Sequence, residues 1–138
     1  MTRTTRFDPR PNLICVSGTV AGPRGETRLR LVVDTGASLS LLVPRIIAEV
    51  GYGPRDARVA TSIGSPLGRE RGFTLTVARF ATLGFSVRDF PVHVFDMAER
   101  ELYDGVIGNN FLRLFNYQVR SREGCIRLEY VPPPPPPP

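Results

Sequence analysis

The sequence lacks lysine and tryptophan altogether, and it contains one histidine and two cysteines among its 138 residues. Structural and catalytic zinc sites draw their ligands chiefly from cysteine and histidine. Cys15 and Cys125 are not at a metal-ligand spacing, and one histidine leaves such a site short of ligands. We therefore expect no metal ion and no other cofactor. So few cysteines favour a reducing compartment, and we expect a cytoplasmic protein.

Long apolar runs and clusters of basic residues are also missing. No run approaches the roughly 20 apolar residues of a membrane-spanning helix, and the polar, proline-broken opening over residues 1–11 does not resemble a signal peptide. All 18 basic residues are arginine, and the formal net charge is +5. Because the arginines are scattered singly and no base-stacking motif accompanies them, we interpret them as a solvated surface and expect no nucleic-acid partner.

The length and the apolar content suit one hydrophobic core, since 41% of the 138 residues are hydrophobic. We divide the chain into an N-terminal arm (1–12), one domain (13–131) and a polyproline tail (132–138). The tail is seven consecutive prolines, which adopt the extended polyproline II conformation. Such a segment either docks in an aromatic groove on another protein or remains a passive extension.

Residues 29–42, LRLVVDTGASLSLL, form the stretch around which the rest is organised. Leu31, Val32 and Val33 predict a short buried strand, because they are aliphatic and show no helical spacing. A carboxylate directly after such a strand is costly unless it is hydrogen-bonded or shares a proton. Asp34 is therefore either capped by its neighbours or used for chemistry.

Two motifs, in order, carry a family resemblance. Residues 34–38, DTGAS, resemble the active-site signature of the retropepsin type of aspartic protease. Downstream, residues 106–108 match the family's element of two apolar residues and a glycine, and Asn110 matches the polar residue that follows it. Asn109 departs from the arginine of retroviral members and cannot form their ion pair. The resemblance spans residues 13–129.

This resemblance implies an all-β fold, a single-lobed retropepsin-like β-barrel with one or two short helices. The residues themselves favour a helix over 44–50, because Pro44 suits the first helical position and Gly51 ends the helix. A second short helix is predicted over 110–115. Residues 1–12 are predicted to be a loose arm.

Two further predicted strands, 58–63 and 69–77, are joined by a glycine-rich loop over 64–68. In the resembled family the flap, a hairpin that closes over bound peptide, falls at this place, whereas an ordinary surface hairpin is the alternative. The predicted flap residues that bind substrate are Ile63, Gly64 and Ser65.

Within the resemblance, Asp34 is the catalytic carboxylate. Thr35 hydrogen-bonds across a dimer, Gly36 offers its carbonyl to substrate, and Ala37 and Ser38 line the same cleft. Peptide hydrolysis by carboxylates needs two of them around one water. Because the chain has one such signature, two copies related by a twofold axis must each supply one carboxylate.

The prediction is therefore a homodimeric aspartic endopeptidase that acts on peptide or protein substrates. The first alternative is a catalytically idle retropepsin-like domain used for dimerisation or peptide binding, and the second is an unrelated all-β binding module. Two other ionisable residues are assigned different roles. His93 lies in a predicted strand without a neighbouring acid or nucleophile pattern, so it is predicted to be structural or exposed. Asp104 is predicted to be a structural or turn residue.

Overall fold

The computed structural model describes residues 1–65, 68–96 and 102–138, with side chains described outside residues 60–71. Its helical elements are α1 (Pro44–Glu49), α2 (Asn109–Leu112) and the 3-10 turn η1 (Pro54–Asp56). Its strands are β1 (Thr2–Arg6), β2 (Cys15–Gly22), β3 (Gly25–Val33), β4 (Leu41–Leu42), β5 (Val59–Ser65), β6 (Gly68–Thr82), β7 (Phe85–Val94), β8 (Gly105–Ile107), β9 (Phe115–Arg120) and β10 (Cys125–Tyr130). The all-β prediction with one or two short helices is confirmed.

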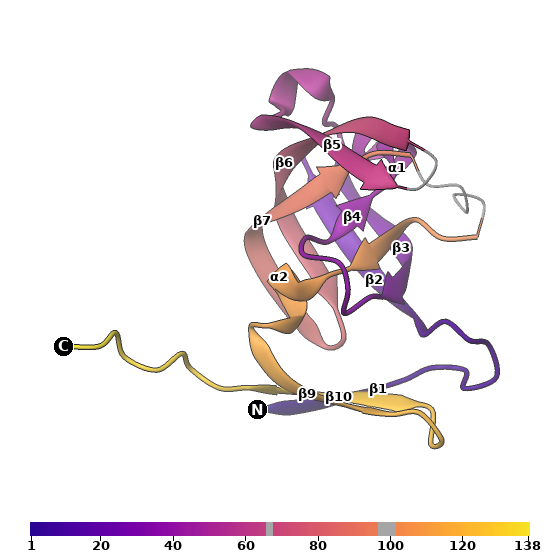
Figure 1. Cartoon of the computed structure of the whole chain (residues 1–138), viewed down its shortest axis with the longest axis vertical. Helices are drawn as coiled ribbons and strands as arrows, with labels where there is room; N and C mark the ends of the chain where they lie inside the picture. Colours follow the sequence, from indigo (N-terminus) through magenta and orange to yellow (C-terminus); the bar gives the residue numbers. More distant parts are fainter. Residues whose placement is uncertain (66–67, 97–101) are drawn as a thin grey trace.

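Six of the described strands close into a barrel in the order β2-β3-β8-β4-β7-β6, and β6 pairs again with β2. β5 pairs with β6 outside this closed ring. The pairs β3–β8 and β4–β7 are parallel, and β4 and β8 are antiparallel. In Figure 1 the sheet formed by β1, β10 and β9 lies beneath the barrel. Closure gives each of these six strands a partner on both sides over part of its length.

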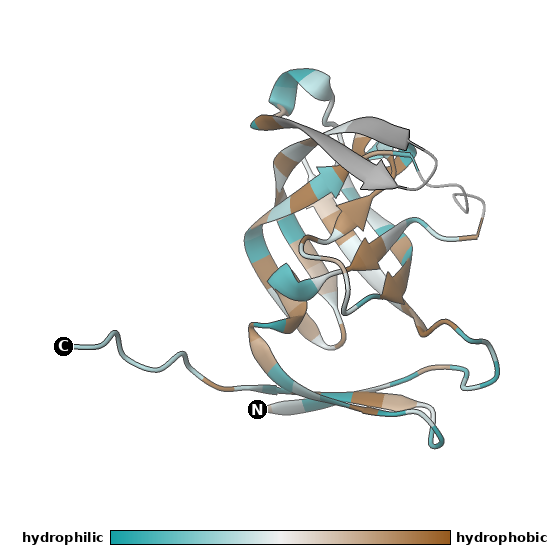
Figure 2. Cartoon of the chain, in the orientation of Figure 1, coloured by the Kyte–Doolittle hydropathy of each residue, from teal (hydrophilic) through white to brown (hydrophobic). Residues whose placement is uncertain are grey.

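Apolar side chains from alternate strand positions fill the barrel, and Figure 2 shows hydrophobic and hydrophilic residues alternating along its strands. Phe80 on β6 stacks on Phe90 of β7, with ring centroids 4.9 Å apart. Phe111 of α2 lies edge-on to both rings, at 5.7 and 6.0 Å. All three side chains are buried. The aromatic cluster therefore anchors the short helix α2 in the barrel core.

The prediction of a loose arm over residues 1–12 is wrong for its first part. Thr2–Arg6 forms β1, which pairs antiparallel with the last strand, from Thr2 opposite Glu129 to Arg6 opposite Cys125. Its side chains are almost all exposed, so the strand has no alternating apolar pattern. Backbone hydrogen bonds to a partner more than a hundred residues away hold it, which local patterning does not reveal.

Most local predictions agree with the structure to within a few residues. Helix α1 begins at Pro44, and Gly51 after it has a φ of 100°, a conformation that favours glycine. The hairpin predicted around residue 66 is confirmed as β5 and β6, with Ser65 opposite Gly68. Pro66 and Leu67 of its predicted loop lie outside the described residues. Helix α2 is shorter than predicted, because β9 already begins at Phe115.

Candidate active site

The loop that follows β3 presents Asp34 at the end of the strand. The Asp34 N–H donates to the carbonyl of Ile107 on β8 (3.0 Å), so the loop leaves the barrel beside that strand. The Gly36 N–H donates to Oδ1 of Asp34 (2.9 Å), and the Ala37 N–H donates to the Asp34 carbonyl (3.2 Å). Asp34, Thr35 and Gly36 are exposed. The carboxylate is thus capped by one backbone N–H, which is one of the two expected alternatives, and it is open to solvent in the single chain.

The start of α2 braces this loop through two asparagines. The Asn109 side-chain amide donates to the Thr35 carbonyl (2.8 Å), and its backbone N–H donates to the Ala37 carbonyl (2.8 Å). The Asn110 N–H donates to the carbonyl of Ser38 (3.2 Å). Asn109, which cannot form the ion pair of retroviral members, therefore holds the loop through neutral hydrogen bonds to the backbone.

A buried serine links the loop to α2 on its inner side. The N–H and the hydroxyl of Ser40 both donate to Oδ1 of Asn110 (2.8 and 2.9 Å), and the hydroxyl accepts from the Gly108 N–H (2.9 Å). A Cβ at Gly108 would lie 2.6 Å from the carbonyl carbon of Leu39, so the close approach requires glycine. Sequence reasoning missed Ser40. The signal was a hydroxyl inside an otherwise apolar run, which needs a partner when buried.

Asp34 lines a cleft of about 450 Å³ together with Gly36, Ala37 and Ser38. The structure thus brings these four predicted site residues together. Thr35 is not part of this lining, and the predicted flap residues Ile63, Gly64 and Ser65 lie in β5 with undescribed side chains, so their contact with substrate stays a prediction. The other lining residues, which sequence reasoning did not assign to the site, are Leu39, Leu41, His93, Phe95 and Val106.

His93 is the ionisable side chain that β7 adds to the wall of the cleft. It is half-buried, and its ring lies 6.4 Å from that of Phe95. Burial lowers the pKa of His93, which favours the neutral imidazole at neutral pH. The predicted structural or exposed role did not place His93 near Asp34. Both residues line the cleft because β7 pairs with β4, Leu41 opposite His93, and a strand pairing of this kind leaves no local motif.

Asp104, the other carboxylate considered from the sequence, is buried and does not line the cleft. Its Oδ2 accepts from the Arg30 N–H (2.8 Å), and its Oδ1 accepts from the guanidinium groups of Arg45 (2.8 Å) and Arg30 (3.4 Å). Burial alone would raise the pKa of Asp104, but these hydrogen bonds outweigh it and the pKa is lowered. This pairing agrees with the predicted structural or turn role, which stays a prediction.

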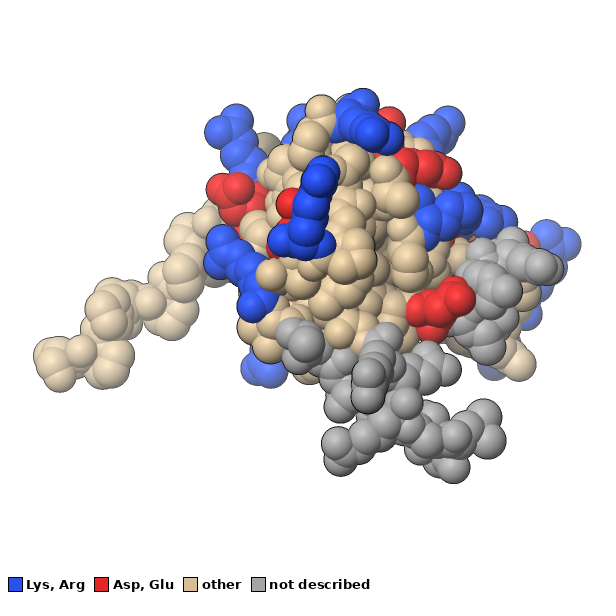
Figure 3. Space-filling model, turned by 90° about the horizontal axis from the view of Figure 1, so that it is seen from above, with Lys and Arg blue, Asp and Glu red and all other residues tan. Residues whose placement is uncertain are grey.

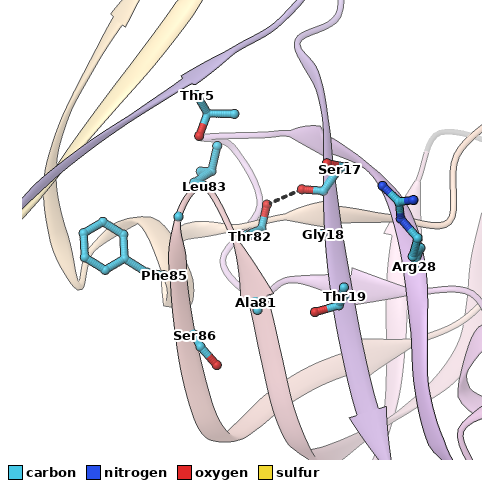
Figure 4. Close-up of a pocket in the computed structure, with 11 residues that line it drawn as sticks. Thr5, Ser17, Gly18, Thr19, Arg28, Ala81, Thr82, Leu83, Phe85 and Ser86 are labelled. Carbon is cyan, nitrogen blue, oxygen red and sulfur yellow. Dashed lines mark hydrogen bonds between the residues drawn. The ribbon is translucent and has the colours of Figure 1, made fainter.

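A second hollow, of about 420 Å³, lies where β2 meets β6 and β7 (Figure 4). Hydroxyl side chains dominate its polar lining, and the Thr82 hydroxyl donates to the Ser17 carbonyl (2.9 Å). Arg28 is the one charged residue among the described residues lining it. These described residues include no carboxylate, histidine or thiol.

Arginine side chains are spread over the face shown in Figure 3, with acidic side chains between them. Several arginines of the chain are paired with acidic side chains, for example Arg79 with Glu26, and Arg45 with Glu49 at 3.3 Å. Within residues 1–65, 68–96 and 102–138, no helix has the length and apolar character needed to cross a membrane. In the same part of the chain, no three His, Cys, Asp or Glu side chains are grouped so that they could hold a metal ion.

Solved structures resemble this fold at low sequence identity. A retropepsin-like aspartic protease from Rickettsia conorii superposes with a TM-score of 0.70 at 16% identity, covering 94% of this chain and 91% of its own. The retroviral protease-like domain of Ddi1 from Leishmania major gives 0.58 at 18% identity, covering 89% and 97%. EIAV protease, solved with the inhibitor HBY-793, gives 0.55 at 20% identity, covering 79% and 92%.

No curated protein matches the sequence. The sequence model of a family described as aspartyl protease matches residues 16–111, which include the Asp34 loop, the cleft and most of α2. This match covers more than half of the 138 residues. With the retropepsin-like barrel of the solved structures, it shows that the chain belongs to the aspartyl protease family.

Proposed function

We propose that this chain is an aspartic endopeptidase that acts as a homodimer, in which two Asp34 carboxylates share one proton and activate a water. One observation carries the proposal: Asp34 is the sole carboxylate among the described residues that line the cleft. Hydrolysis by carboxylates requires a second one on the same water. A second copy of the chain supplies it when both Asp34 loops meet at a twofold axis.

The exposure of the loop supports this assembly. Asp34, Thr35 and Gly36 are all exposed in the single chain, although the loop is held from behind by the two asparagines of α2. A braced and exposed loop is suited to contact the same loop of a second chain. Two carboxylates about 3 Å apart cannot both ionise, so they hold one proton between them. The ionised one accepts a proton from the water, and the protonated one hydrogen-bonds the scissile carbonyl.

The neighbouring residues take the roles expected for substrate binding in this proposal. The Thr35 hydroxyl bonds across the dimer, and the Gly36 carbonyl accepts from the substrate backbone. Ala37 and Ser38, which line the cleft with Asp34, contact the substrate side chain. Leu39, Leu41 and Val106 make the cleft largely apolar, which favours an apolar side chain beside the cleaved bond. Ile63, Gly64 and Ser65 close over the peptide from the β5–β6 hairpin.

A catalytically idle domain is the second candidate. It would keep the fold and use the exposed loop or the cleft for dimerisation or peptide binding. The Leishmania domain that shares the fold is described as protease-like, which supports keeping this candidate. The two candidates differ in one observable, since both bind peptide but only the enzyme releases new termini.

The test is hydrolysis of an unfolded protein such as casein by the purified chain, followed by the appearance of new amino termini. We expect turnover that pepstatin-like statine inhibitors block, and activity per chain that rises with chain concentration and then levels off. Solution mass, measured over the same range, should show the monomer–dimer transition. A dimer that binds pepstatin without turnover supports the idle domain. Turnover by a strict monomer contradicts the shared site.

We further propose a cytoplasmic location for this activity. Cys15 and Cys125 are both free thiols in the structure, as expected in a reducing compartment. Alkylation of the protein after denaturation of intact cells, without reductant, should label both cysteines. A mass that shows one disulfide in place of two labelled thiols contradicts this location.

A further inference from the structure

A further concave surface differs from the cleft of Asp34 in its composition and in its lining residues. It is a groove of about 460 Å³, called here the aromatic groove, where the barrel meets the β1–β10–β9 sheet. It shares no lining residue with the cleft of Asp34. Its apolar walls come from Met1, Phe85, Val87, Leu114, Phe115 and Tyr130.

Three rings from three strands form a row along this groove. Phe85 of β7 lies 4.5 Å from Phe115 of β9, measured between ring centroids, and their planes are tilted by 37°. Tyr130 of β10 lies 6.3 Å from Phe115, nearly edge-on at 68°. Tyr130 and Leu114 remain 49% and 43% exposed. An exposed apolar concavity of this kind marks a binding surface.

The chain itself carries the type of ligand that aromatic grooves bind. Residues 132–138 are seven prolines that begin two positions after Tyr130. All of them are exposed, and in Figure 1 they run away from the barrel. Polyproline II segments dock on rows of aromatic rings because the helix is preformed and loses little conformational entropy on binding.

Hydrogen-bonding groups at the groove complement a proline segment as well. Prolines have carbonyl acceptors and no N–H donors. Three of the described residues that line the groove, Tyr130, Ser86 and Arg88, carry side-chain hydrogen-bond donors. No described lining residue carries a carboxylate. Its chemistry therefore matches a ligand that is apolar on its rings and accepts hydrogen bonds on its backbone.

We propose that the aromatic groove binds the proline segment 132–138 of a second copy of this chain. The segment cannot turn back into the groove of its own chain. Val131 would be the only hinge after Tyr130, and a β-branched residue before proline is restricted to extended conformations. Each proline but the last is also followed by a proline, so the whole segment stays straight over about 22 Å. Two copies related by a twofold axis exchange their segments reciprocally.

The first test measures the groove alone. The receiver is the 138-residue chain in which all seven prolines of 132–138 are replaced by serine, and the probe is a fluorescein-labelled peptide of sequence VPPPPPPP. We expect a saturable rise of fluorescence anisotropy. Tyr130→Ser in the receiver should raise the Kd at least tenfold, and Tyr130→Phe should raise it less because the ring remains. Tyr117→Ser is the matched control, since Tyr117 is an exposed tyrosine of β9 outside the groove.

Absence of saturable probe binding contradicts the proposal that the groove binds a proline segment. Equal binding by the Tyr130→Ser and Tyr117→Ser receivers contradicts it as well. Urea unfolding of each variant establishes that it is folded. The probe should bind equally well to a receiver that also carries Asp34→Asn. The binding assay therefore does not depend on the proposed hydrolysis, and the two proposals fail separately.

The second test uses the parent chain, which keeps its seven prolines, to determine which segment occupies the groove. When dilute, the parent should bind the probe as tightly as the receiver does, because its own segment cannot fill its groove. As parent concentration rises, probe binding per chain should fall, because segments of other copies compete. A parent that excludes the probe at every dilution shows that the segment fills its own groove and overturns the second copy as occupant. If rising parent concentration never displaces the probe, a second copy is not the occupant. The groove is then assigned to another proline-rich protein.

Discussion

Two carboxylates lie at opposite ends of the same pair of parallel strands. β3 and β8 run side by side, from Leu31 opposite Gly105 to Val33 opposite Ile107. Asp104 immediately precedes β8, at the beginning of the pair, and Asp34 immediately follows β3, at its end. Asp104 is buried and bonded to two arginines, whereas Asp34 is exposed and receives a backbone N–H from Gly36.

The contrast separates a carboxylate that holds the barrel together from one that is available for chemistry. The charge of Asp104 is neutralised by Arg30 and Arg45, and its lowered pKa keeps it ionised. A group whose charge and geometry are already satisfied has no capacity left for a substrate. Asp34 has its position fixed by the loop but no described cation beside it, so a second carboxylate can approach and share its proton.

The largest expected effect concerns the rate of hydrolysis. Asp34→Asn removes the ionisable group and should lower kcat/KM by about 10²–10⁴-fold or more, the usual contribution of acid–base catalysis. The free energy of unfolding should change by less than about 0.5 kcal/mol, because the exposed amide keeps an oxygen for the Gly36 N–H. Peptide hydrolysis and urea unfolding on the same preparation measure both quantities.

Asp104→Asn is the matched comparison in the same assay. The folded variant should retain most of its kcat/KM, because Asp104 does not line the cleft. A folded Asp104→Asn protein without turnover would mean that the second catalytic carboxylate is Asp104. Unchanged activity of Asp34→Asn, in a preparation free of other proteases, would remove Asp34 from the mechanism.

The second effect is on stability. Asp104→Asn removes the charge that pairs with two guanidinium groups, and the free energy of unfolding at pH 7 should fall by about 1–3 kcal/mol. Arg30 and Arg45 are half-exposed and regain water, which limits the loss. Asp89→Asn, which changes an exposed carboxylate of β7, should cost less than about 0.5 kcal/mol. A loss from Asp104→Asn no larger than that from Asp89→Asn contradicts the structural role.

The stabilisation by Asp104 has a defined pH dependence. Because its pKa is lower in the folded than in the unfolded protein, the contribution is present above the unfolded value of about 3.9 and is lost as pH falls through the folded value. The difference in stability between parent and Asp104→Asn should therefore be full at pH 7 and shrink below about pH 4. Urea unfolding curves of both proteins at a series of pH values measure it.

A third effect follows from the shared use of Asp34. With a tenfold excess of Asp34→Asn chains, random pairing leaves about one parent chain in eleven in a fully parental dimer. Activity per parent chain should fall to about a tenth. The same excess of folded Asp104→Asn chains should not lower it, because each of those chains still supplies an Asp34. Activity of the parent chains that is unchanged by the excess of Asp34→Asn chains would show that each chain works alone.

Local patterns predicted the parts of the fold that local chemistry determines. Pro44 and Gly51 mark the ends of α1 because one restricts φ and the other tolerates a positive φ. Leu31, Val32 and Val33 predicted the strand that ends just before Asp34, and the structure places Ala37 and Ser38, assigned by the resemblance, in the same cleft. In these segments neighbours in sequence are also neighbours in space.

Features made by distant pairings were not predictable in this way. β1 has a polar sequence and exists because β10 lies beside it. His93 enters the cleft because β7 pairs with β4, and Ser40 is satisfied by Asn110, 70 positions along the chain. The partners of Asp104 come from β3 and α1. Each of these contacts depends on how the barrel closes, which no short motif records.

The smallest effect tests the environment of Asp34 itself. Ala37 lines the cleft with Asp34, and its N–H donates to the Asp34 carbonyl at 3.2 Å. Its methyl group donates no hydrogen bond, whereas a serine there can donate to the ionised carboxylate. Stabilising the ionised form favours loss of the shared proton. Ala37→Ser should therefore move the upper limb of the kcat/KM profile to lower pH, by up to about one unit for one hydrogen bond.

Ala48→Ser, on the exposed side of α1, is the control and should leave the profile in place. Both profiles are measured on one peptide, with the dimer fraction determined at each pH. An upper limb that is unchanged or moves upward would show that the side chain at position 37 does not reach the paired carboxylates.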